Sequence, residues 1–447
     1  MASQAPDSLA CASHSLPLLN RRSVVVSAGA FLAMAGGSST RAEDELAVRE
    51  AVRDLYIFAY PLLEMARARA RLLAGGQANV FRHATTLSDH TSRRVTTPNN
   101  DTLYSSAWID LNQGPVTLTV PAARDRYLSV ALMDMYSNNF AYAGTRANNG
   151  RGVQLRLFAP GTRGRRDGIT APTSWVWGLG RTLVEGADDL AAARAVQHGL
   201  GLTGPAAQPP GEPPGRDAGA TAELRSMVEL IEANPPPRAH QGRINEALRT
   251  VLERENEPAW STTIEGGVAD ARRAVEQEPE TAQALAGWLY PKPQLGNFGD
   301  DFLYRASIAR WGLAALEPRE AMYMRGAGSS PDRTYDGTRL HRLRFEPGRL
   351  PPARAFWSLS LYETTPEGDL FFTPNPLNRY AIGDRTPGLT RDADGGLTLW
   401  IGPDPGEARR ANWLPAPDGR FALVLRAYLP EPELLSGDYR LPPVEPL

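Results

Sequence analysis

The chain has 447 residues, of which 42% are hydrophobic, and its formal net charge is -2. This length accommodates two or three domains, and the composition is typical of a globular protein that buries a sizeable core. Because the charge is nearly balanced, no field of one sign attracts nucleic acid or an anionic membrane, and neither is expected as a partner. Lys292 is the only lysine and lies between two prolines, which argues against Schiff-base chemistry.

The first 42 residues are predicted to be an export signal. Arg21 and Arg22 form a twin-arginine pair, and the apolar run that follows, 24–35, is too short to cross a bilayer. Small residues then lead to an acceptable cleavage site ending at Ala42. A twin-arginine signal directs a folded protein across the membrane, and an ordinary secretory signal is the alternative. Both place the mature protein in the periplasm or outside the cell.

The only cysteine, Cys11, falls inside this signal. The mature chain therefore has no thiol, which excludes a disulfide, a zinc–thiolate site, an iron–sulfur cluster and a cysteine nucleophile. No later segment is apolar enough for an integral membrane span. The sequence has no phosphate-binding loop, G-x-S-x-G motif or histidine pair with metal-ligand spacing, so no cofactor and no metal ligand set is predicted.

Residues 43–203 are expected to form an amino-terminal β-rich domain with leading helices. A helix is predicted over 44–75, broken or kinked at Pro61, because proline lacks a donor and clashes with the preceding turn. Short β-prone runs then alternate with turn residues, a spacing typical of an antiparallel sandwich or barrel. These runs are 104–109, 116–120, 127–133, 153–158 and 175–179.

Residues 204–220 are rich in proline and glycine and predict a linker. A helical segment is expected over 221–330, with helices at 222–233, 243–254, 268–289 and 302–324. Residues 331–447 predict a carboxy-terminal β-sandwich domain with strands at 354–363, 397–401 and 421–428. In the first of these strands, one face is wholly apolar and the other mixed, as a half-buried strand requires. The predicted fold class is α+β, mainly β: two antiparallel β-sandwich-like domains with a helical segment between them.

The densest polar segment precedes the strand at 104–109. Asn99, Asn100, Asp101 and Tyr104 provide donors and acceptors that suit a sugar, a carboxylate or a hard cation. The alternative is a turn that begins at Pro98, in which Asn and Asp side chains cap their own backbone. The sequence leaves both interpretations open.

A second polar segment follows the strand at 127–133. Asp134 and Asn138 end this strand, and Asp134 would form an acid–base carboxylate pair with Asp101 if the two turns faced one another. The alternative is again a strand-end turn. A lone histidine that is satisfied by local hydrogen bonds is the better interpretation for each histidine, and His83 is the better functional candidate, as a single acid–base group.

The run 371–386 gathers Arg379, Tyr380 and Asp384, and Trp413 lies in a later proline-rich run. Arginine and tyrosine could clamp an anionic or sugar ligand. The alternatives are an Arg–Asp brace that fixes a long loop and a tryptophan that fills the core beneath it.

Four runs carry a family resemblance: PNNDTLYSSAW at 98–108, PTSWVWGLGRT at 172–182, PNPLNRYAIGDRTPGL at 374–389 and NWLPAP at 412–417. They resemble the bacterial family that pairs domain of unknown function 1254 with domain of unknown function 1214. The likeness spans roughly 50–200 and 335–445 and its motifs are long. It implies two β-rich domains with helices between them, often behind an export signal, and it implies no activity or catalytic residue. The run from Gly204 resembles an insertion peculiar to this chain.

These observations predict an exported protein that binds a small polar molecule, with hydrolase or lyase chemistry by carboxylates as the first hypothesis. Asp101, Asp134 and His83 are its acid–base candidates. The expected ligand-binding residues are Asn99, Asn100, Tyr104, Asn138, Arg379, Tyr380, Asp384 and Trp413. The alternative is a non-catalytic envelope protein that binds a glycan or a lipid-derived ligand. The oligomeric state is left open, a homo-oligomer included.

Overall fold

The computed structural model describes residues 31–93, 96–162, 167–207, 210–211, 213–215, 218–279, 281–330, 332–366 and 368–447. The predicted export signal up to residue 30, with Arg21, Arg22 and Cys11, lies outside the described residues. Val48–Leu447 form one compact unit, and the described residues before Val48 belong to another. None of the helices in the described ranges combines the length and apolar character that crossing a membrane requires.

The amino-terminal domain contains two sheets. In the first sheet the strand order is β1-β2-β8-β4-β5, and in the second it is β7-β6-β3-β9. The strands are β1 (Arg82–His83), β2 (Thr102–Asp110), β3 (Val116–Val120), β4 (Leu128–Met133), β5 (Asn139–Gly144), β6 (Val153–Phe158), β7 (Ile169–Thr170), β8 (Trp175–Leu183) and β9 (Gly201–Thr203), with helices α2 (Thr145–Asn148), η1 (Ala187–Asp189) and α3 (Leu190–His198). Ile109 and Val130 of the first sheet share one core with Leu118 and Leu157 of the second, so the two sheets pack on one another.

The carboxy-terminal domain also contains two sheets. The larger follows the order β10-β11-β12-β20-β15-β16, and the smaller follows β19-β18-β14-β21. The strands are β10 (Thr281–Leu285), β11 (Trp288–Pro291), β12 (Ala321–Gly326), β13 (Tyr335–Asp336), β14 (His341–Phe345), β15 (Ala353–Thr364), β16 (Leu370–Phe371), β17 (Ala381–Gly383), β18 (Leu397–Gly402), β19 (Trp413–Pro415), β20 (Arg420–Pro430) and β21 (Val444–Pro446), with helices α7 (Phe302–Trp311), η3 (Glu407–Asn412) and α8 (Pro432–Ser436). Leu359 and Leu425 of the larger sheet and Leu343 and Leu399 of the smaller belong to one core.

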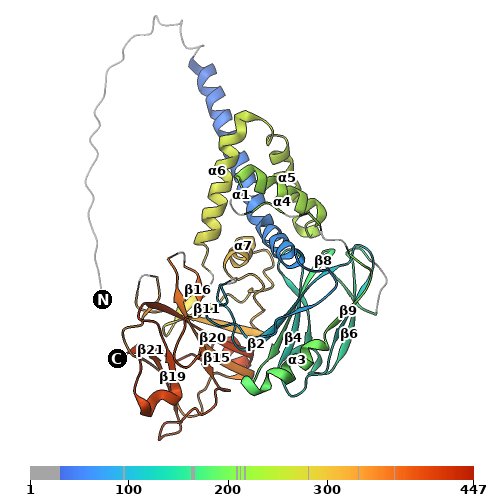
Figure 1. Cartoon of the computed structure of the whole chain (residues 1–447). Helices are drawn as coiled ribbons and strands as arrows, with labels where there is room; N and C mark the ends of the chain where they lie inside the picture. The colour runs from blue at the N-terminus through green and yellow to red at the C-terminus, as the bar shows by residue number, and fades with distance from the viewer. Residues whose placement is uncertain are drawn as a thin grey trace, which may run out of the picture. The chain divides into compact units, whose positions relative to one another are not determined.

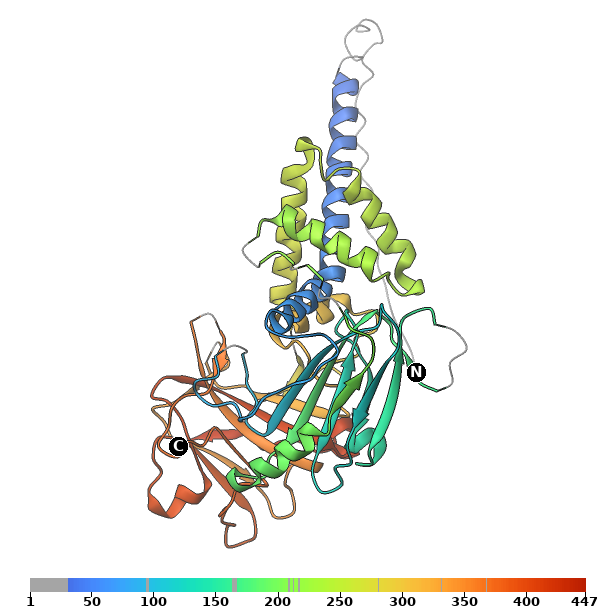
Figure 2. The same ribbon diagram turned by 45° about the vertical axis from the view of Figure 1, so that its right-hand side comes forward.

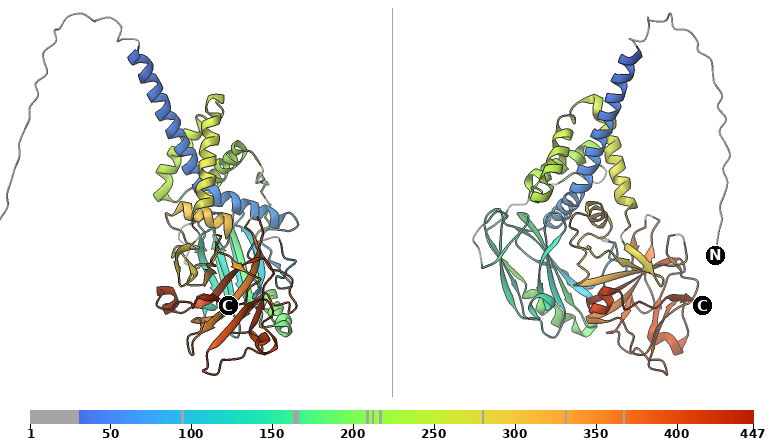
Figure 3. Two further views of the ribbon diagram at one scale, coloured as in Figure 1. Left: turned by 90° about the vertical axis from the view of Figure 1, so that its left-hand side faces the viewer. Right: turned by 180° about the vertical axis from the view of Figure 1, so that it is seen from behind.

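The helices gather beside the amino-terminal sheets (Figure 1, Figure 2). They are α1 (Phe31–Leu73), α4 (Ala220–Ala233), α5 (Arg238–Leu252), η2 (Pro258–Trp260) and α6 (Ser261–Gln277). α1 continues through Pro61 as one helix and changes direction along its length, as a proline inside a helix predicts (Figure 3). Phe58 of α1 and Ile264 of α6 share a core with Trp108 and Met133, so the helices cover part of the outer face of the first sheet.

The segment 221–330 is less helical than its sequence predicts. The helix expected over 268–289 ends at Gln277, two residues before Pro279, and a hairpin of β10 and β11 follows. Ala286 and Gly287, at φ 49° and 80°, form the two-residue turn of this hairpin. The helix expected over 302–324 likewise ends at Trp311, before Gly312, and β12 begins at Ala321. Helices make up about 30% of the chain and strands about 28%. The α+β class is therefore confirmed, with helix and strand in nearly equal amounts.

Both faces of β15 are buried, although its alternation predicts a half-buried strand. Trp357, Leu359 and Leu361 lie in the carboxy-terminal core as expected. The opposite face carries Phe356, Ser358, Ser360 and Tyr362, which are at most 1% exposed. This face is covered because Phe356 packs with Tyr127 and Leu183 of the amino-terminal domain. The two domains therefore meet through the outer faces of their larger sheets, side by side in Figures 1 and 3.

Part of the predicted linker lies against α1. Arg67 Nε donates a hydrogen bond to the carbonyl oxygen of Pro214 at 3.0 Å, and Nη2 donates to that of Gly215 at 2.9 Å. The described part of this segment is therefore attached to the helical layer.

Candidate functional site

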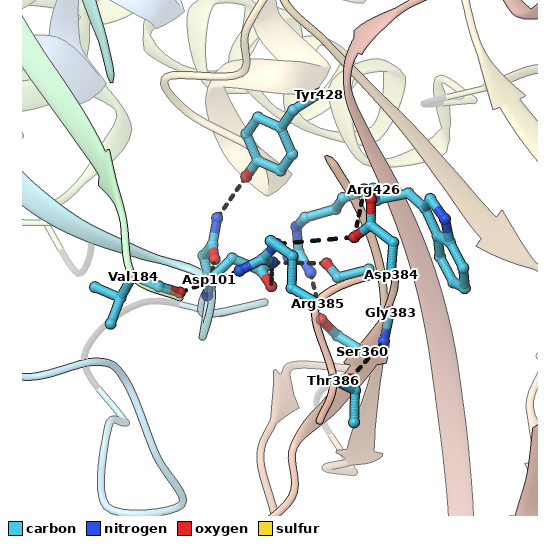
Figure 4. Close-up of polar contacts among 12 residues, drawn as sticks. Asp101, Val184, Ser360, Gly383, Asp384, Arg385, Thr386, Arg426 and Tyr428 are labelled. Carbon is cyan, nitrogen blue, oxygen red and sulfur yellow. Dashed lines mark hydrogen bonds and ion pairs between the residues drawn. The ribbon is translucent and has the colours of Figure 1, made fainter. Parts of the chain in front are cut away.

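The turn at 96–101 joins the amino-terminal domain to the outer face of β15 and β20, and we call this contact the domain seam. Asn99 holds the turn locally, because its Oδ1 accepts the backbone N–H of Asp101 at 2.6 Å. Its Nδ2 donates to the Tyr428 hydroxyl of β20 at 2.5 Å (Figure 4). The hydroxyl of Tyr362, on β15, donates to the carbonyl oxygen of Pro98 at 2.7 Å. The Asn- and Asp-rich turn thus serves as a connection between domains.

Asp101 is buried at the centre of the seam. Its Oδ2 accepts a hydrogen bond from Ser358 Oγ at 2.6 Å, and its Oδ1 pairs with Arg385 Nη2 at 2.9 Å (Figure 4). Arg385 Nε lies 3.8 Å from Asp384, whose pKa is raised to about 6 by burial while Arg385 partly lowers it. Both oxygens of Asp101 are occupied by protein donors, and Arg385 connects the loop at 371–386 to the turn at 96–101.

A cleft of about 690 Å³ lies beside the turn that follows β4. Six polar residues of its lining are Asp134, Asn138, Asn139, His240, Arg305 and Glu317. Asp134 Oδ1 accepts the backbone N–H groups of Tyr136 and Asn138, at 2.9 and 3.0 Å. Ser137 in the same turn has φ 64°, the left-handed region that non-glycine residues adopt at an energetic cost. The turn therefore fixes one oxygen of Asp134, and among the described residues Oδ2 accepts only a long hydrogen bond from Asn138 Nδ2, at 3.3 Å.

Burial determines the electrostatics of this cleft. It raises the pKa of Asp134 to about 6, against the opposing effects of hydrogen bonds from Asn138 and the charge of Arg305. Burial also lowers the pKa of Arg305 to about 10, so the guanidinium remains charged at neutral pH. Arg305 packs among the rings of Phe58, Tyr136 and Phe302, with ring centroids 5.0–5.1 Å away. The cleft thus combines a carboxyl group that titrates near neutrality with a fixed cation.

The structure does not bring Asp101 and Asp134 together. β8 pairs with both neighbouring strands, and Leu183 lies opposite Thr102, whereas Trp177 lies opposite Met133. The six-residue offset along β8 separates the two turns by about 20 Å. The carboxylate pair inferred from the sequence is therefore not formed, because β2 begins at the end of the sheet where β4 also begins.

His83 does not line this cleft either. It lies on β1, and two strands, β2 and β8, separate β1 from β4, a distance of about 14 Å across the sheet. Its Nδ1 is 2.8 Å from Ser105 Oγ, and burial lowers its pKa, with a further lowering from His198. A locally hydrogen-bonded, neutral histidine is the interpretation that these contacts favour.

The remaining predicted ligand-binding residues lie apart from the cleft or serve local structure. Arg379 Nη1 donates to the carbonyl oxygens of Ala411 and Trp413, at 3.0 and 2.8 Å. Trp413 is buried, and its Nε1 donates to the carbonyl oxygen of Gly402 at 2.9 Å. The Tyr380 hydroxyl contacts His90 Nδ1 at 2.7 Å, and Asn100 Nδ2 donates to the carbonyl oxygen of Ser88. Tyr104 packs beneath the guanidinium of Arg181. Of the predicted set, the cleft contains only Asp134 and Asn138.

Sequence reasoning missed the arginines and His240. Arg305, Arg181 and Arg426 are each at most 5% exposed and lie in otherwise apolar stretches of α7, β8 and β20. A charged residue within an apolar strand or helix is the signal that identifies them. No group of three or more His, Cys, Asp or Glu side chains suited to a metal ion occurs among the residues that the structure describes.

Comparison with known proteins gives the following matches. The family model described as "Protein of unknown function (DUF1254)" matches residues 78–204, and the one described as "Protein of unknown function (DUF1214)" matches 320–432. The crystal structure of the VPA0106 protein from Vibrio parahaemolyticus is similar at 20% identity and a TM-score of 0.68, covering 90% of this chain and 100% of that one. A putative uncharacterized protein from Burkholderia cenocepacia aligns at 13% identity and a TM-score of 0.42, with coverage of 93% and 97%. No curated protein matches significantly.

The seam can be tested by the substitution Asp101→Asn, which keeps the shape of the side chain and removes its charge. Arg385 then loses its carboxylate, and the free energy of unfolding should fall by about 2–4 kcal/mol. Asp394→Asn is the matched control, because Asp394 is 53% exposed in its pair with Arg344 and its loss should cost under about 1 kcal/mol. Urea denaturation measures both. Equal losses would show that Asp101 contributes no more than a surface carboxylate.

The pH dependence of stability tests the environment of Asp134. Because its folded-state pKa of about 6 exceeds its ordinary value of 3.8, the folded protein retains this proton over a pH range in which the unfolded chain releases it. Its contribution to stability is complete below about pH 4 and is lost as the pH rises through 6, by about 3 kcal/mol. The free energy of unfolding of wild type minus that of Asp134→Asn should fall by this amount between pH 4 and 7.5. Asp300 lines the same cleft and its side chain is 86% exposed. The stability of Asp300→Asn should therefore depend on pH as that of wild type does. A pH-independent difference would contradict the burial of Asp134.

Proposed function

The chain belongs to the family that pairs DUF1254 with DUF1214, and these names state no activity. From the cleft itself, we propose that the protein binds a small polar molecule there, with Asp134 as the acid–base group. One observation carries this proposal. Asp134 is a desolvated carboxyl group with a pKa of about 6, located in the wall of a cleft of about 690 Å³. Perturbed carboxyl groups in clefts are concentrated at functional sites.

The size and lining of the cleft support a small polar ligand. Its volume falls within the range of roughly 300–1,000 Å³ that small-molecule sites occupy. Arg305 and His240 provide donors or positive charge, and Glu317 and Asn139 provide acceptors, so both ends of a polar molecule would find partners. The left-handed backbone at Ser137 is a further feature of functional turns.

A carboxyl group with this pKa suits proton transfer near neutral pH. In its protonated form Asp134 would donate a proton to a leaving group, and in its ionised form it would accept one from water or from the substrate. Arg305 would hold the ionised form after donation, because the two groups already interact. Hydrolysis and elimination both require this step and both remain within the proposal. The alternative function, ligand binding without turnover, uses the same cleft without proton transfer.

A screen of amino acids, hydroxy acids and monosaccharides by thermal shift should identify a ligand that raises the melting temperature. For a ligand that wild type converts to product, Asp134→Asn should lower the turnover rate by about 100-fold or more and leave the fold intact. Asp300→Asn, at the exposed rim, should retain most of the activity. Binding without any product, unchanged by Asp134→Asn, would favour the non-catalytic alternative. A ligand located outside the cleft in a crystal structure would refute the proposal.

We also propose that the protein acts in the periplasm or outside the cell, on the evidence of the twin-arginine pair and apolar run at its start. The substitutions Arg21→Lys and Arg22→Lys together keep both charges but remove the pair. With a twin-arginine signal, the variant should accumulate in the cytoplasm, whereas wild type appears in the periplasmic fraction. Unchanged export of the variant would favour the ordinary secretory signal, and retention of wild type in the cytoplasm would contradict export.

A further inference from the structure

Two buried arginines face the domain seam. Arg181 of β8 is 5% exposed and Arg426 of β20 is 4% exposed. Both occupy positions on the outer faces of their sheets, where Arg181 lies opposite Tyr104 in register and Arg426 lies opposite Tyr323. Arginine stays charged in proteins, so each guanidinium requires partners for its donors.

The donors of Arg426 are satisfied by neutral oxygens. Its Nη1 donates to Ser360 Oγ at 2.9 Å and to the Tyr362 hydroxyl at 2.7 Å, and Nη2 donates to the carbonyl oxygen of Thr97 at 3.2 Å. This arginine therefore acts as a structural connection between β15, β20 and the turn at 96–101.

Arg181 is different, because one of its donors has no partner. Its Nη2 donates to the carbonyl oxygen of Ala314 at 3.1 Å, whereas Nη1 has no hydrogen-bond partner within the described part of the chain. The centroid of the Tyr104 ring lies 5.3 Å from the guanidinium carbon of Arg181. The face of the ring offsets part of the positive charge, but it does not accept a hydrogen bond from an N–H in the guanidinium plane. A buried, charged donor without an acceptor is costly, and such a group calls for an explanation.

Arg67 shows how the same protein satisfies a structural buried arginine. It is 6% exposed, and its Nη1 and Nη2 each lie 2.7 Å from a carboxylate, those of Glu64 and Glu223. No corresponding ion pair joins Arg181 to a carboxylate among the described residues. Asp101, at the centre of the seam, is already bound to Arg385 and Ser358, and Asp384 lies beside the same arginine. Neither of these carboxylates pairs with Arg181 within the described part of the chain.

Several tyrosines lie near enough to Arg181 to influence its charge. Burial by itself would lower the pKa of Arg181, but the neighbouring hydroxyls of Tyr104, Tyr323 and Tyr428 raise it above its usual value. Burial raises the pKa of Tyr428 well above its usual value, so this hydroxyl keeps its proton. Because its oxygen already accepts the amide of Asn99, the proton is free to be donated to another acceptor. Tyr104 and Tyr323 are each partly exposed.

We propose that the seam contains an anion-binding site, in which Arg181 Nη1 and the hydroxyls of Tyr104 and Tyr428 bind the oxygen atoms of a carboxylate or phosphate group. An oxyanion supplies the acceptor that Nη1 lacks and a negative charge beside Arg181, which forms no ion pair among the described residues. The three proposed donors come from β8, β2 and β20, so both domains contribute to the site. None of them lines the Asp134 cleft, and this inference therefore does not rest on the proposed function.

The test is a titration of the purified protein with inorganic phosphate, with succinate and with the neutral control glycerol, at constant ionic strength. Isothermal titration calorimetry should show saturable binding of phosphate or succinate and none of glycerol. Arg181→Gln should weaken binding by about 10-fold or more, the loss expected when a charged hydrogen-bond donor is removed. Arg379→Gln is the matched control, because Arg379 donates to the carbonyl oxygens of Ala411 and Trp413. This variant should bind the anion with the affinity of wild type. Asp134→Asn should also bind the anion as wild type does.

Tyr428→Phe keeps the aromatic packing with Phe356, 4.2 Å between ring centroids, and removes one proposed donor. It should weaken anion binding by a few-fold, and it preserves the test if Arg181→Gln does not fold. The proposal is overturned if neither anion binds saturably, if Arg181→Gln binds as tightly as wild type, or if Tyr428→Phe has unchanged affinity. Preferential binding of phosphate or of succinate would identify which oxyanion the site favours.

Discussion

The attachment of one six-residue turn to the opposing domain determines the arrangement of everything else in residues 48–447. Thr97 N–H bonds to the carbonyl oxygen of Leu370 at 2.7 Å, and Asp101 pairs with Arg385 and Ser358. These bonds are polar and buried, so a shift of one domain against the other would leave several donors and acceptors without partners. An apolar contact tolerates sliding, whereas this seam specifies one register between the outer faces of the two larger sheets.

The sequence was most informative where burial is one-sided and apolar. The strands expected at 116–120 and 153–158 coincide with β3 and β6, because their apolar residues alternate and turn residues bound them. The same rule failed for the second face of β15. Ser358 and Ser360 are small and polar, so their positions resemble an exposed face, although the neighbouring domain covers them. Alternation reports which side is apolar and gives no information about a polar side that another domain buries. The helices predicted over 268–289 and 302–324 failed for a different reason, since their short apolar continuations fit a buried strand as well as a helix.

The candidate site was predicted in part. Turns rich in Asn and Asp attracted attention as ligand-binding segments, yet Asn99 and Asp101 satisfy one another and the opposing domain. Asp134 alone of the acid–base candidates reached a cleft, and nothing in its own segment separates it from Asp101. The difference depends on what packs around each turn, which is a tertiary property. The more specific signal was the presence of arginine within apolar segments, as in the strand that contains Arg181. A charged side chain within a buried strand requires an ion pair, hydrogen bonds or a bound ligand to offset the cost of its burial.

One segment connects the cleft with the arginine cluster of the seam. The carbonyl oxygen of Ala314 accepts the bond from Arg181, and that of Ala315 accepts one from Asn139 in the cleft wall, at 2.9 Å. Ala314 has φ 69°, a left-handed conformation that costs free energy for a residue with a side chain. Glu317, three residues later, lines the cleft, and its backbone N–H donates a hydrogen bond to the Tyr142 hydroxyl at 3.1 Å. Since the same strained stretch of backbone contacts Arg181 on one side and the cleft on the other, a displacement of it on either side would alter hydrogen bonds on both. The two sites have no side chain in common, but both contact the backbone at Ala314 and Ala315.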